Sequence, residues 1–345
     1  MNTLKKETKV ASRSETSAAS QPVNWRKIVA KYQQPCPKKS SWQIINSIGP
    51  YLLLWAAMCI TVQHSWPLTI ALAALAGLFL IRIFIIFHDC GHGSFFASKR
   101  ANNLLGFITG VMTFTPYRYW RWQHAVHHGT SGNLDHRGTG DIWTMTVNEY
   151  RSASPWMRLR YVISRNPIVV FIIAPLGIFW FYQRFAFDGA SKRDRRSVLW
   201  TNLALAIYIG AMSLFLGFWN YFWIQLTLTL VSGTAGVWLF YVQHQFEDTY
   251  WRKADEWDYL TSAMQGSSYY KLPKLMQWFS GNIGFHHIHH LSSRIPNYNL
   301  EACHHAEPFF QQVPELTLRA SIKSVNLRLW DEEGEKLVGY KHLRQ

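Results

Sequence analysis

The sequence predicts an all-α integral membrane protein, with four transmembrane helices arranged as two hairpins. Four long apolar segments occur as two closely spaced pairs, which predicts the hairpins. Only 16% of the 345 residues are charged, whereas soluble domains average about a quarter. Much of the molecular surface is therefore expected to face lipid. Histidines gathered beside the apolar segments are the main candidates for a functional site.

The chain begins with polar and basic segments. Residues 1–24 are rich in Lys, Ser and Thr and lack apolar periodicity, which predicts a disordered basic tail. No apolar core follows the first lysines, so this tail is not a secretory signal. Residues 25–46 combine tryptophans and aliphatic residues with lysines. That mixture is typical of a segment lying at a membrane surface.

Four apolar stretches can reach, with their flanks, the roughly 20 residues that a membrane span requires. The two members of each pair are separated by only a few residues, and tryptophans lie at both turns. Tryptophan is enriched where a span meets the membrane surface, so these turns are expected at the membrane–water boundary. The expected spans are about 48–65, 67–87, 199–216 and 222–243.

The positive charges predict the orientation in the cell membrane. The first 40 residues and the segment 189–197 are strongly basic, whereas the two short turns contain no Lys or Arg. The positive-inside rule then places both termini and residues 88–198 in the cytoplasm. Two weaker apolar runs, 104–115 and 168–182, are expected to be interfacial or half-buried. A span at 168–182 would put the basic segment outside.

The charge distribution excludes several classes of function. The formal net charge is +15, yet the expected spans contain a single formal charge, Arg82, and no acidic residue. An ion path normally leaves ionisable residues inside the membrane, so transport is disfavoured. The basic surroundings suit an anionic membrane surface or an acidic protein partner. Nucleic acid is a poor partner, because no recognised binding motif accompanies the charge.

Eight of the 15 histidines fall into three groups with helical spacing, in the sequences HDCGH, HAVHH and HHIHH. On an α-helix, positions i, i+3 and i+4 lie within about 100° of one another, on a single face. Each group is therefore expected to aim two or three imidazoles at one point, and neutral imidazole is a common metal ligand. The eight residues are His88, His92, His124, His127, His128, His286, His289 and His290.

Two further histidines, His287 and His244, differ from these eight in their position along the chain. His287 lies about 100° from His286 around a helix axis, outside the face of its neighbours, and is left out of the ligand set. His244 stands at the expected cytoplasmic end of the fourth span. Because the other groups are expected on that side too, His244 is included as a ninth candidate ligand.

The number of histidines indicates which metal site is expected. Eight or nine imidazoles are too many for one ion and about right for two. A structural zinc site usually includes cysteine, and no HExxH motif of a metalloprotease is present. Two irons used for oxygen chemistry are the favoured interpretation, and the spacing leaves two zincs or two coppers open.

At these motifs the sequence resembles the membrane fatty-acid desaturases, in particular the bacterial acyl-lipid branch. The likeness is greatest to the Δ5-type phospholipid desaturases of bacilli, and HDCGH is shared with Δ12 enzymes. It covers most of residues 45–340. The stretches that carry it are 82–96, 120–128, 132–150, 236–251 and 272–291.

The resemblance implies four transmembrane helices under a cytoplasmic helical cap. It implies a desaturase domain over 47–310 and a cytoplasmic C-terminal extension over 311–345. It implies a diiron centre held by the eight histidines and His244, with O2 as co-substrate. The reaction would insert a cis double bond into acyl chains of membrane lipids. The chain has no HPGG haem motif of a fused cytochrome b5 domain, so electrons would come from a separate donor, with ferredoxin favoured over cytochrome b5. Neither the bond position nor the acyl carrier can be predicted.

Four other residues lie in or near the histidine motifs. Asp89, Asp141 and Asn282 are expected to orient imidazoles by hydrogen bonds, or else to cap helices. Trp143 is expected beside the substrate tunnel or the ligands, or else in ordinary interfacial packing.

Two competing functions stay open. A diiron hydroxylase of lipid or hydrocarbon would use the same scaffold. A metal-binding or metal-transporting membrane protein would belong to a different class.

Overall fold

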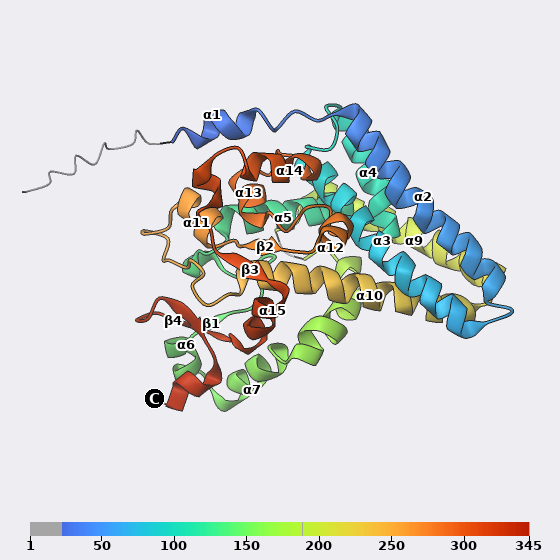
Figure 1. Cartoon of the computed structure of the whole chain (residues 1–345). Coiled ribbons are helices and arrows are strands. Elements are labelled where there is room, and N and C mark those ends of the chain that lie inside the picture. Colours follow the sequence, from blue (N-terminus) through green and yellow to red (C-terminus); the bar gives the residue numbers. More distant parts are fainter. Residues whose placement is uncertain (1–22, 188, 345) are drawn as a thin grey trace, which may run out of the picture.

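Four long helices dominate the computed structural model, which describes residues 23–187 and 189–344 (Figure 1). The expected tail over 1–24 lies almost wholly outside the described residues. All four helices are long and apolar enough to cross a membrane, which confirms the predicted all-α membrane architecture. They are α2 (Pro37–Thr61), α3 (Trp66–His92), α9 (Lys192–Leu216) and α10 (Phe218–His244).

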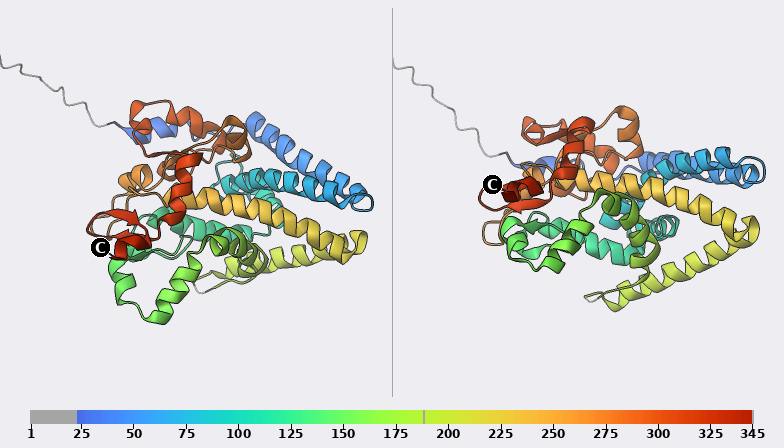
Figure 2. Two further views of the ribbon diagram at one scale, coloured as in Figure 1. Left: turned by 60° about the horizontal axis from the view of Figure 1, so that its bottom comes forward. Right: turned by 90° about the horizontal axis from the view of Figure 1, so that it is seen from below.

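The long helices form the two predicted hairpins. A short turn after Thr61 joins α2 to α3, and Gly217, with φ of 85°, joins α9 to α10. Both turns lie at the end of the molecule remote from the cap, as Figures 1 and 2 show. The helices α3 and α10 pack so closely that a Cβ atom on Gly77 would lie 2.8 Å from the Val231 side chain.

The surface of the hairpins matches a lipid environment. A buried core shared by α2, α3 and α10 includes Met58, Ala73 and Leu228. The outward faces are also apolar, with Leu53 72% exposed and Leu214 91% exposed. Apolar surface on this scale is stable only when something other than water covers it.

Local sequence explains why two long helices extend past their apolar parts toward the cap. Pro37 occupies the first turn of α2, where its missing N–H costs nothing. Ser191 and Asp194 form a capping box that begins α9 within the basic segment. The helices therefore begin about 11 and 7 residues before the expected spans at 48 and 199.

The C-terminal ends of α3 and α10 bring histidines to the cap. Gly93, with φ of 71°, ends α3, and its N–H bonds to the carbonyls of Asp89 and Cys90. Glycine adopts this left-handed conformation without steric cost. The last turn of α3 therefore carries His88 and His92, while α10 ends at His244.

The chain between the hairpins begins and ends on the histidine side. Helix α4 (Lys99–Met112) packs back along α3, and α5 (Tyr117–Thr130) returns toward the cap. Further along, α7 (Pro155–Ser164) meets the partly π-helical segment Val169–Arg184 at a bend of 60°. By length and composition this bent pair is the one candidate for a fifth span in the described residues.

The cap is built from short helices around the histidines. In Figure 1 it occupies the side of the molecule opposite the two hairpin turns. The remaining α-helices with four or more residues are α1 (Trp25–Ala30), α6 (Val147–Ser152), α11 (Tyr259–Gln265), α12 (Lys274–Phe279), α13 (His286–Leu291), α14 (Asn297–His304) and α15 (Leu318–Ser321).

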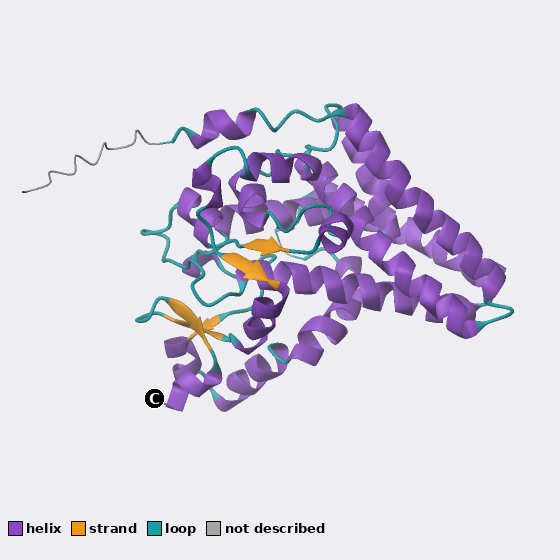
Figure 3. Cartoon of the chain, viewed as in Figure 1, coloured by secondary structure: helices purple, strands orange, loops and turns teal. Residues whose placement is uncertain are grey.

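Two small sheets tie the C-terminal segment into the cap (Figure 3). The first sheet has the order β1 (Met145–Thr146), β4 (Leu329–Asp331), β5 (Lys336–Val338), in which β1 and β4 are parallel and β4 and β5 are antiparallel. The second sheet is the parallel pair of β2 (Tyr269–Lys271) and β3 (Glu315–Thr317). No strand was expected, because two or three residues are too few to show an alternating pattern.

Arg82 is the lone charge in the expected spans, and its guanidinium group reaches into the cap. Its guanidinium lies 3.9 Å from the Trp278 ring centroid and donates a hydrogen bond to the Trp278 carbonyl. The side-chain oxygen Oδ1 of Asn46, on α2, lies 3.4 Å from Nε of Arg82. These contacts join α3 to α12, just before the chain reaches the third histidine motif.

Candidate metal centre

All nine predicted histidines converge where α3, α5, α10 and α13 meet. Their side chains are buried or half-buried, although about 200 residues separate the first from the last. Their donor nitrogens gather into two adjoining groups, called the first and second imidazole groups below.

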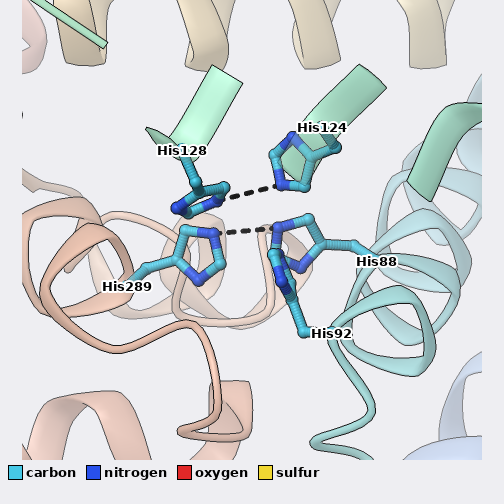
Figure 4. A group of neighbouring side chains, drawn as sticks. All are labelled: His88, His92, His124, His128 and His289. Atoms are coloured by element: carbon cyan, nitrogen blue, oxygen red, sulfur yellow. Dashed lines mark hydrogen bonds between the residues drawn. The ribbon is translucent and has the colours of Figure 1, made fainter. Parts of the chain in front are cut away.

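The first imidazole group contains five residues whose donor nitrogens all lie within 4.8 Å of one another. The Nε2 atoms of His88 and His289 are 3.1 Å apart, and those of His124 and His128 are 3.2 Å apart. Figure 4 shows all five rings pointing toward a common centre from three parts of the chain. The members are His88, His92, His124, His128 and His289.

The second imidazole group lies beside the first. It contains His127, His244 and His290, whose donor nitrogens also lie within 4.8 Å of one another. His286 joins it, because its Nε2 is 2.9 Å from Nε2 of His244 and 3.1 Å from Nε2 of His290. The rings of His128 and His290 stack at 4.2 Å between centroids, so the two groups touch.

Each HxxHH motif is divided between the two groups, which corrects the expectation that its three imidazoles meet at one point. On α5, His124 and His128 reach the first group while His127 reaches the second. On α13, His289 reaches the first group, whereas His286 and His290 reach the second. Both helices cross the boundary between the groups, so the roughly 100° between neighbouring residues separates their targets.

Three imidazoles are oriented by acceptors at their Nδ1 atoms. Asp89 Oδ1 lies 3.0 Å from Nδ1 of His88, and Asp141 Oδ1 lies 2.6 Å from Nδ1 of His127. The carbonyl of Gly266 lies 3.0 Å from Nδ1 of His244. An acceptor at Nδ1 keeps the proton there and leaves Nε2 as the metal-binding atom.

Asp89 is itself held by residues that the sequence did not indicate. Its Oδ2 accepts hydrogen bonds from the backbone N of Asn297 at 2.7 Å and from Nδ2 of Asn297 at 2.8 Å. The same Nδ2 lies 3.1 Å from Oε1 of Gln43 on α2. Asn297 and Gln43 are more than 250 residues apart, so no local pattern could have paired them.

Two of the additional candidates lie away from the imidazoles. Trp143 is 41% exposed, and its ring meets that of Tyr161 at 5.1 Å rather than the cavity described below. Asn282, with φ of 59°, donates from Nδ2 to the Asn297 carbonyl at 3.3 Å. Among the described residues, Asn282 makes no hydrogen bond to the nine imidazoles.

His287 lies outside both groups, as expected from its helical position. It is fully buried, and its Nε2 is 3.0 Å from Nδ1 of His304 on α14. This pair packs in the cap on the side of α13 away from the two groups.

The electrostatics of the site favour neutral imidazoles. Burial lowers the pKa of His289 and His290 well below the ordinary value, and nearby imidazoles lower it further. The same causes lower the pKa of His124 and His128. Neutral imidazole carries the lone pair that binds a metal ion.

The donor set fits a pair of metal ions. The Nε2 atoms of His92 and His127 are buried and have no hydrogen-bond partner, although each belongs to one of the groups. Unpaired buried nitrogens are costly unless a further group completes them. One metal ion in each imidazole group would do so.

A mostly apolar cavity of about 450 Å³ opens from the imidazoles between the long helices. His88, His124 and His286 line one end, and α10 lines its length from Gln243 to Gln225. This part of α10 spans roughly 27 Å, close to the hydrocarbon thickness of a bilayer, which is about 30 Å. The shape and lining suit a long apolar chain.

Comparisons with known proteins point to one family. The family model described as fatty acid desaturase matches residues 64–318. A protein named fatty acid desaturase, from Bacillus subtilis (strain 168), is 47% identical over 319 residues, which cover 92% of this chain and 90% of that protein.

More distant relatives have names that describe lipid substrates. An sn-1 oleoyl-lipid 12-desaturase of a Picosynechococcus strain is 28% identical, over 76% of this chain and 75% of its own length. An sn-1 acyl-lipid omega-3 desaturase (ferredoxin) of a Nostoc strain is 27% identical, over 79% and 76%. Together with the nine converging imidazoles, the matches confirm the predicted family: this chain belongs to the fatty acid desaturases, membrane oxidoreductases with a histidine-rich metal centre.

Proposed function

We propose that this enzyme inserts a cis double bond into an acyl chain of a membrane lipid, with two irons as cofactor and O2 as co-substrate. The observation that carries the proposal is the contact between the imidazole groups and the apolar cavity. His88, His124 and His286 belong to these groups and also line the cavity. An acyl chain inside the cavity would therefore lie against the metal centre.

Nine imidazoles are assigned as the iron ligands. The first imidazole group would hold one iron, and the second, including His286, would hold the other. Two bound irons would supply the oxygen chemistry that removes two hydrogens from an unactivated acyl chain, which no amino-acid side chain can do.

The protein's own residues position the reaction. Asp89, Asp141 and the Gly266 carbonyl hold three imidazoles so that their Nε2 atoms face inward. Phe240 and Leu80 belong to the apolar wall that excludes water and keeps the acyl chain extended. The depth to which the chain enters would select the bond that is oxidised.

We place the centre on the cytoplasmic side of the cell membrane, with both termini in the cytoplasm. The basic segment 189–197 and the histidine ends of α3 and α10 lie on the same side, which supports this orientation. We assign catalysis to residues 47–310, with 311–345 completing the cap. The electron donor is proposed to be a separate acidic ferredoxin, and the donor named for the Nostoc relative supports this choice.

The test is the acyl-chain profile of a desaturase-free bacterium that expresses this chain with a ferredoxin. Mass spectrometry with double-bond localisation should find a new alkene. A His289→Ala variant should lose it, and the matched control His305→Ala should keep it, because His305 is exposed and outside both groups. Hydroxylated chains in place of alkenes would instead establish a hydroxylase.

A further inference from the structure

The two sides of the metal centre are covered very differently. On the α13 side, His286, His289 and His290 are buried, and Val29 of α1 shares a buried cluster with Ile288 of α13. Figure 1 shows α1 and α14 lying over this side. On the α5 side, three imidazoles of the first group are only half-buried; these are His92, His124 and His128.

Two of the half-buried imidazoles, His124 and His128, belong to α5, and the exposed face of that helix lies beside them. Arg118, Arg121, Ala125 and Gly129 follow one another along this face, and all four are exposed. Ala125 and Gly129 have no long side chain, so little covers the neighbouring imidazole rings. The nitrogen atoms Nε2 of His92 and Nδ1 of His128 are nevertheless covered by protein. The centre is therefore close to the surface here without being open to water.

This surface is strongly basic. Helix α5 packs against α9 and α4, and the first turns of these two helices are basic. We call the exposed cations of the three helices the basic face. All eight are exposed, and they are Lys99, Arg100, Arg118, Arg121, Lys192, Arg193, Arg195 and Arg196.

Almost nothing offsets the positive charge of the basic face. Residues 99–130 and 189–200 contain one acidic residue, Asp194. It is buried, caps α9 through Ser191, and lies 4.0 Å from Nε of Arg118. The neighbouring Asp188 lies outside the described residues. The field above α5 thus favours a negatively charged partner.

We propose that the basic face is the docking site for the acidic one-electron carrier that reduces the metal centre. This inference rests on the proposed function, which requires an external source of electrons. Electron transfer slows steeply with distance, so a carrier must dock where the metal ligands approach the surface. The basic face satisfies that condition and also steers an acidic partner into place.

The α13 side offers a second basic surface, and it suits an acidic carrier less well. Arg26, Lys27 and Lys31 on or beside α1 are exposed, but the imidazoles below them are buried. Exposed acidic residues lie on this side too. Tyr259 donates to the His290 carbonyl at 2.7 Å, and the loop leading to Tyr259 carries Asp255, Glu256 and Asp258.

Lipid phosphates are the competing ligand for the basic face. Only two residues separate Arg195 and Arg196 from Leu199 and Trp200, which are exposed and apolar, so these two cations lie nearest the membrane. Arg121 lies about one helical turn after Arg118 along α5, toward the half-buried imidazoles. A headgroup site would not require cations beside the metal ligands, whereas a docking site for an electron carrier would.

The experiment uses the iron-loaded, full-length protein in nanodiscs of neutral phosphatidylcholine, with a plant-type [2Fe–2S] ferredoxin as the carrier. The docking variant combines Arg100→Glu, Arg121→Glu and Arg193→Glu. The matched control combines Arg26→Glu, Lys27→Glu and Lys31→Glu, which makes the same change in charge on the other side of the centre. Titration gives the ferredoxin Kd, and stopped-flow absorbance gives the reduction rate at low and high salt.

The docking variant should bind ferredoxin at least tenfold more weakly at low salt, and its reduction rate should lose most of its salt dependence. The control should stay within about twofold of the wild type. Equal effects of the two variants, or no effect of the docking variant, would overturn the proposal. A docking variant that binds anionic vesicles more weakly but binds ferredoxin as the wild type does would also overturn the proposal. If the triple variant does not fold, Arg100→Glu and Arg193→Glu are measured singly, each with an expected weakening of about threefold.

Dithionite separates this inference from the proposed function. The docking variant reduced by dithionite should form product in a single turnover as the wild type does, because its metal centre is unchanged. If dithionite-reduced wild type forms no product, the proposed function fails. The affinities for ferredoxin would still decide where the carrier docks.

Discussion

Asp89 and Asp141 each bind one imidazole of the metal centre through its Nδ1 atom, yet their surroundings differ. Asp89 is 2% exposed, and its second oxygen accepts two hydrogen bonds from Asn297. The second oxygen of Asp141 is buried without a partner, and the residue borders the apolar cavity. Asp141 also follows two left-handed glycines, Gly138 and Gly140, in a loop.

The difference indicates two kinds of support. The first imidazole group is tied through Asp89 to α14 and, through Gln43, to α2. The second group depends, at His127, on Asp141, whose second oxygen has no hydrogen-bond partner among the described residues. We expect both pairs to contribute to metal affinity, and the first pair to contribute more to folding than the second.

Acid should affect the metal-free protein more than any single substitution. Burial lowers the pKa of His124, His128, His289 and His290 in the folded state, so the unfolded chain binds more protons below about pH 6.5. Stability is therefore fully present above that pH and is lost as the pH falls below it.

Each pKa unit of difference corresponds to about 1.4 kcal/mol, so four such imidazoles should destabilise the metal-free protein by several kcal/mol near pH 5. Thermal unfolding in detergent between pH 8 and pH 5, with and without iron, measures this loss. Bound metal should oppose it, because ligated imidazoles are held deprotonated. A metal-free melting temperature that does not change with pH would contradict the expectation.

Asp89→Ala should have the largest effect among the substitutions that compare the two pairs. It leaves two buried donors of Asn297 and Nδ1 of His88 without acceptors, and each such group costs about 1–3 kcal/mol. Loss of an outer carboxylate also lowers metal affinity by roughly 10–100-fold. Iron content and thermal unfolding of the metal-free protein should both fall. Normal stability in this variant would mean that the Asn297 contacts are not the anchor.

Asp141→Ala should lower iron affinity by roughly tenfold. It leaves one buried donor, Nδ1 of His127, without an acceptor, so the metal-free protein should lose about 1–3 kcal/mol of stability, less than Asp89→Ala loses. Competition with a chelator measures the affinity. Asp141→Asn keeps an oxygen that can accept from Nδ1, so it should recover part of the loss. A loss of stability as large as that of Asp89→Ala would remove the distinction between the pairs.

Asn297→Ala should have the smallest effect, about 1 kcal/mol in stability and a few-fold in iron affinity. Its backbone N–H still donates to Asp89, so only the two bonds of Nδ2, to Asp89 and to Gln43, disappear. Asn299→Ala on the same helix is the matched control, since Asn299 bonds to the Tyr32 carbonyl and not to Asp89. If the two variants release iron equally, Asn297 has no role in holding the first group.

Local pattern determined much of the molecule. The four apolar stretches, their pairing into hairpins and the nine converging histidines follow from helical periodicity and charge, which act over short distances along the chain. Local pattern also excluded His287 from the ligand set, because its angle on the helix turns it away from its neighbours. In the structure it meets His304 instead. The family resemblance is also confirmed by the comparisons.

Tertiary structure alone decided how these pieces act together. The division of each HxxHH motif between two groups depends on how α5 and α13 cross the centre, and spacing within one helix cannot specify that crossing. Asn297 meets Asp89 from the far end of the chain, and Trp143 turns toward Tyr161 instead of the cavity. The basic face likewise exists only because α4, α5 and α9 pack side by side. Periodicity places a side chain on a face of its own element, whereas long-range packing decides what that face meets.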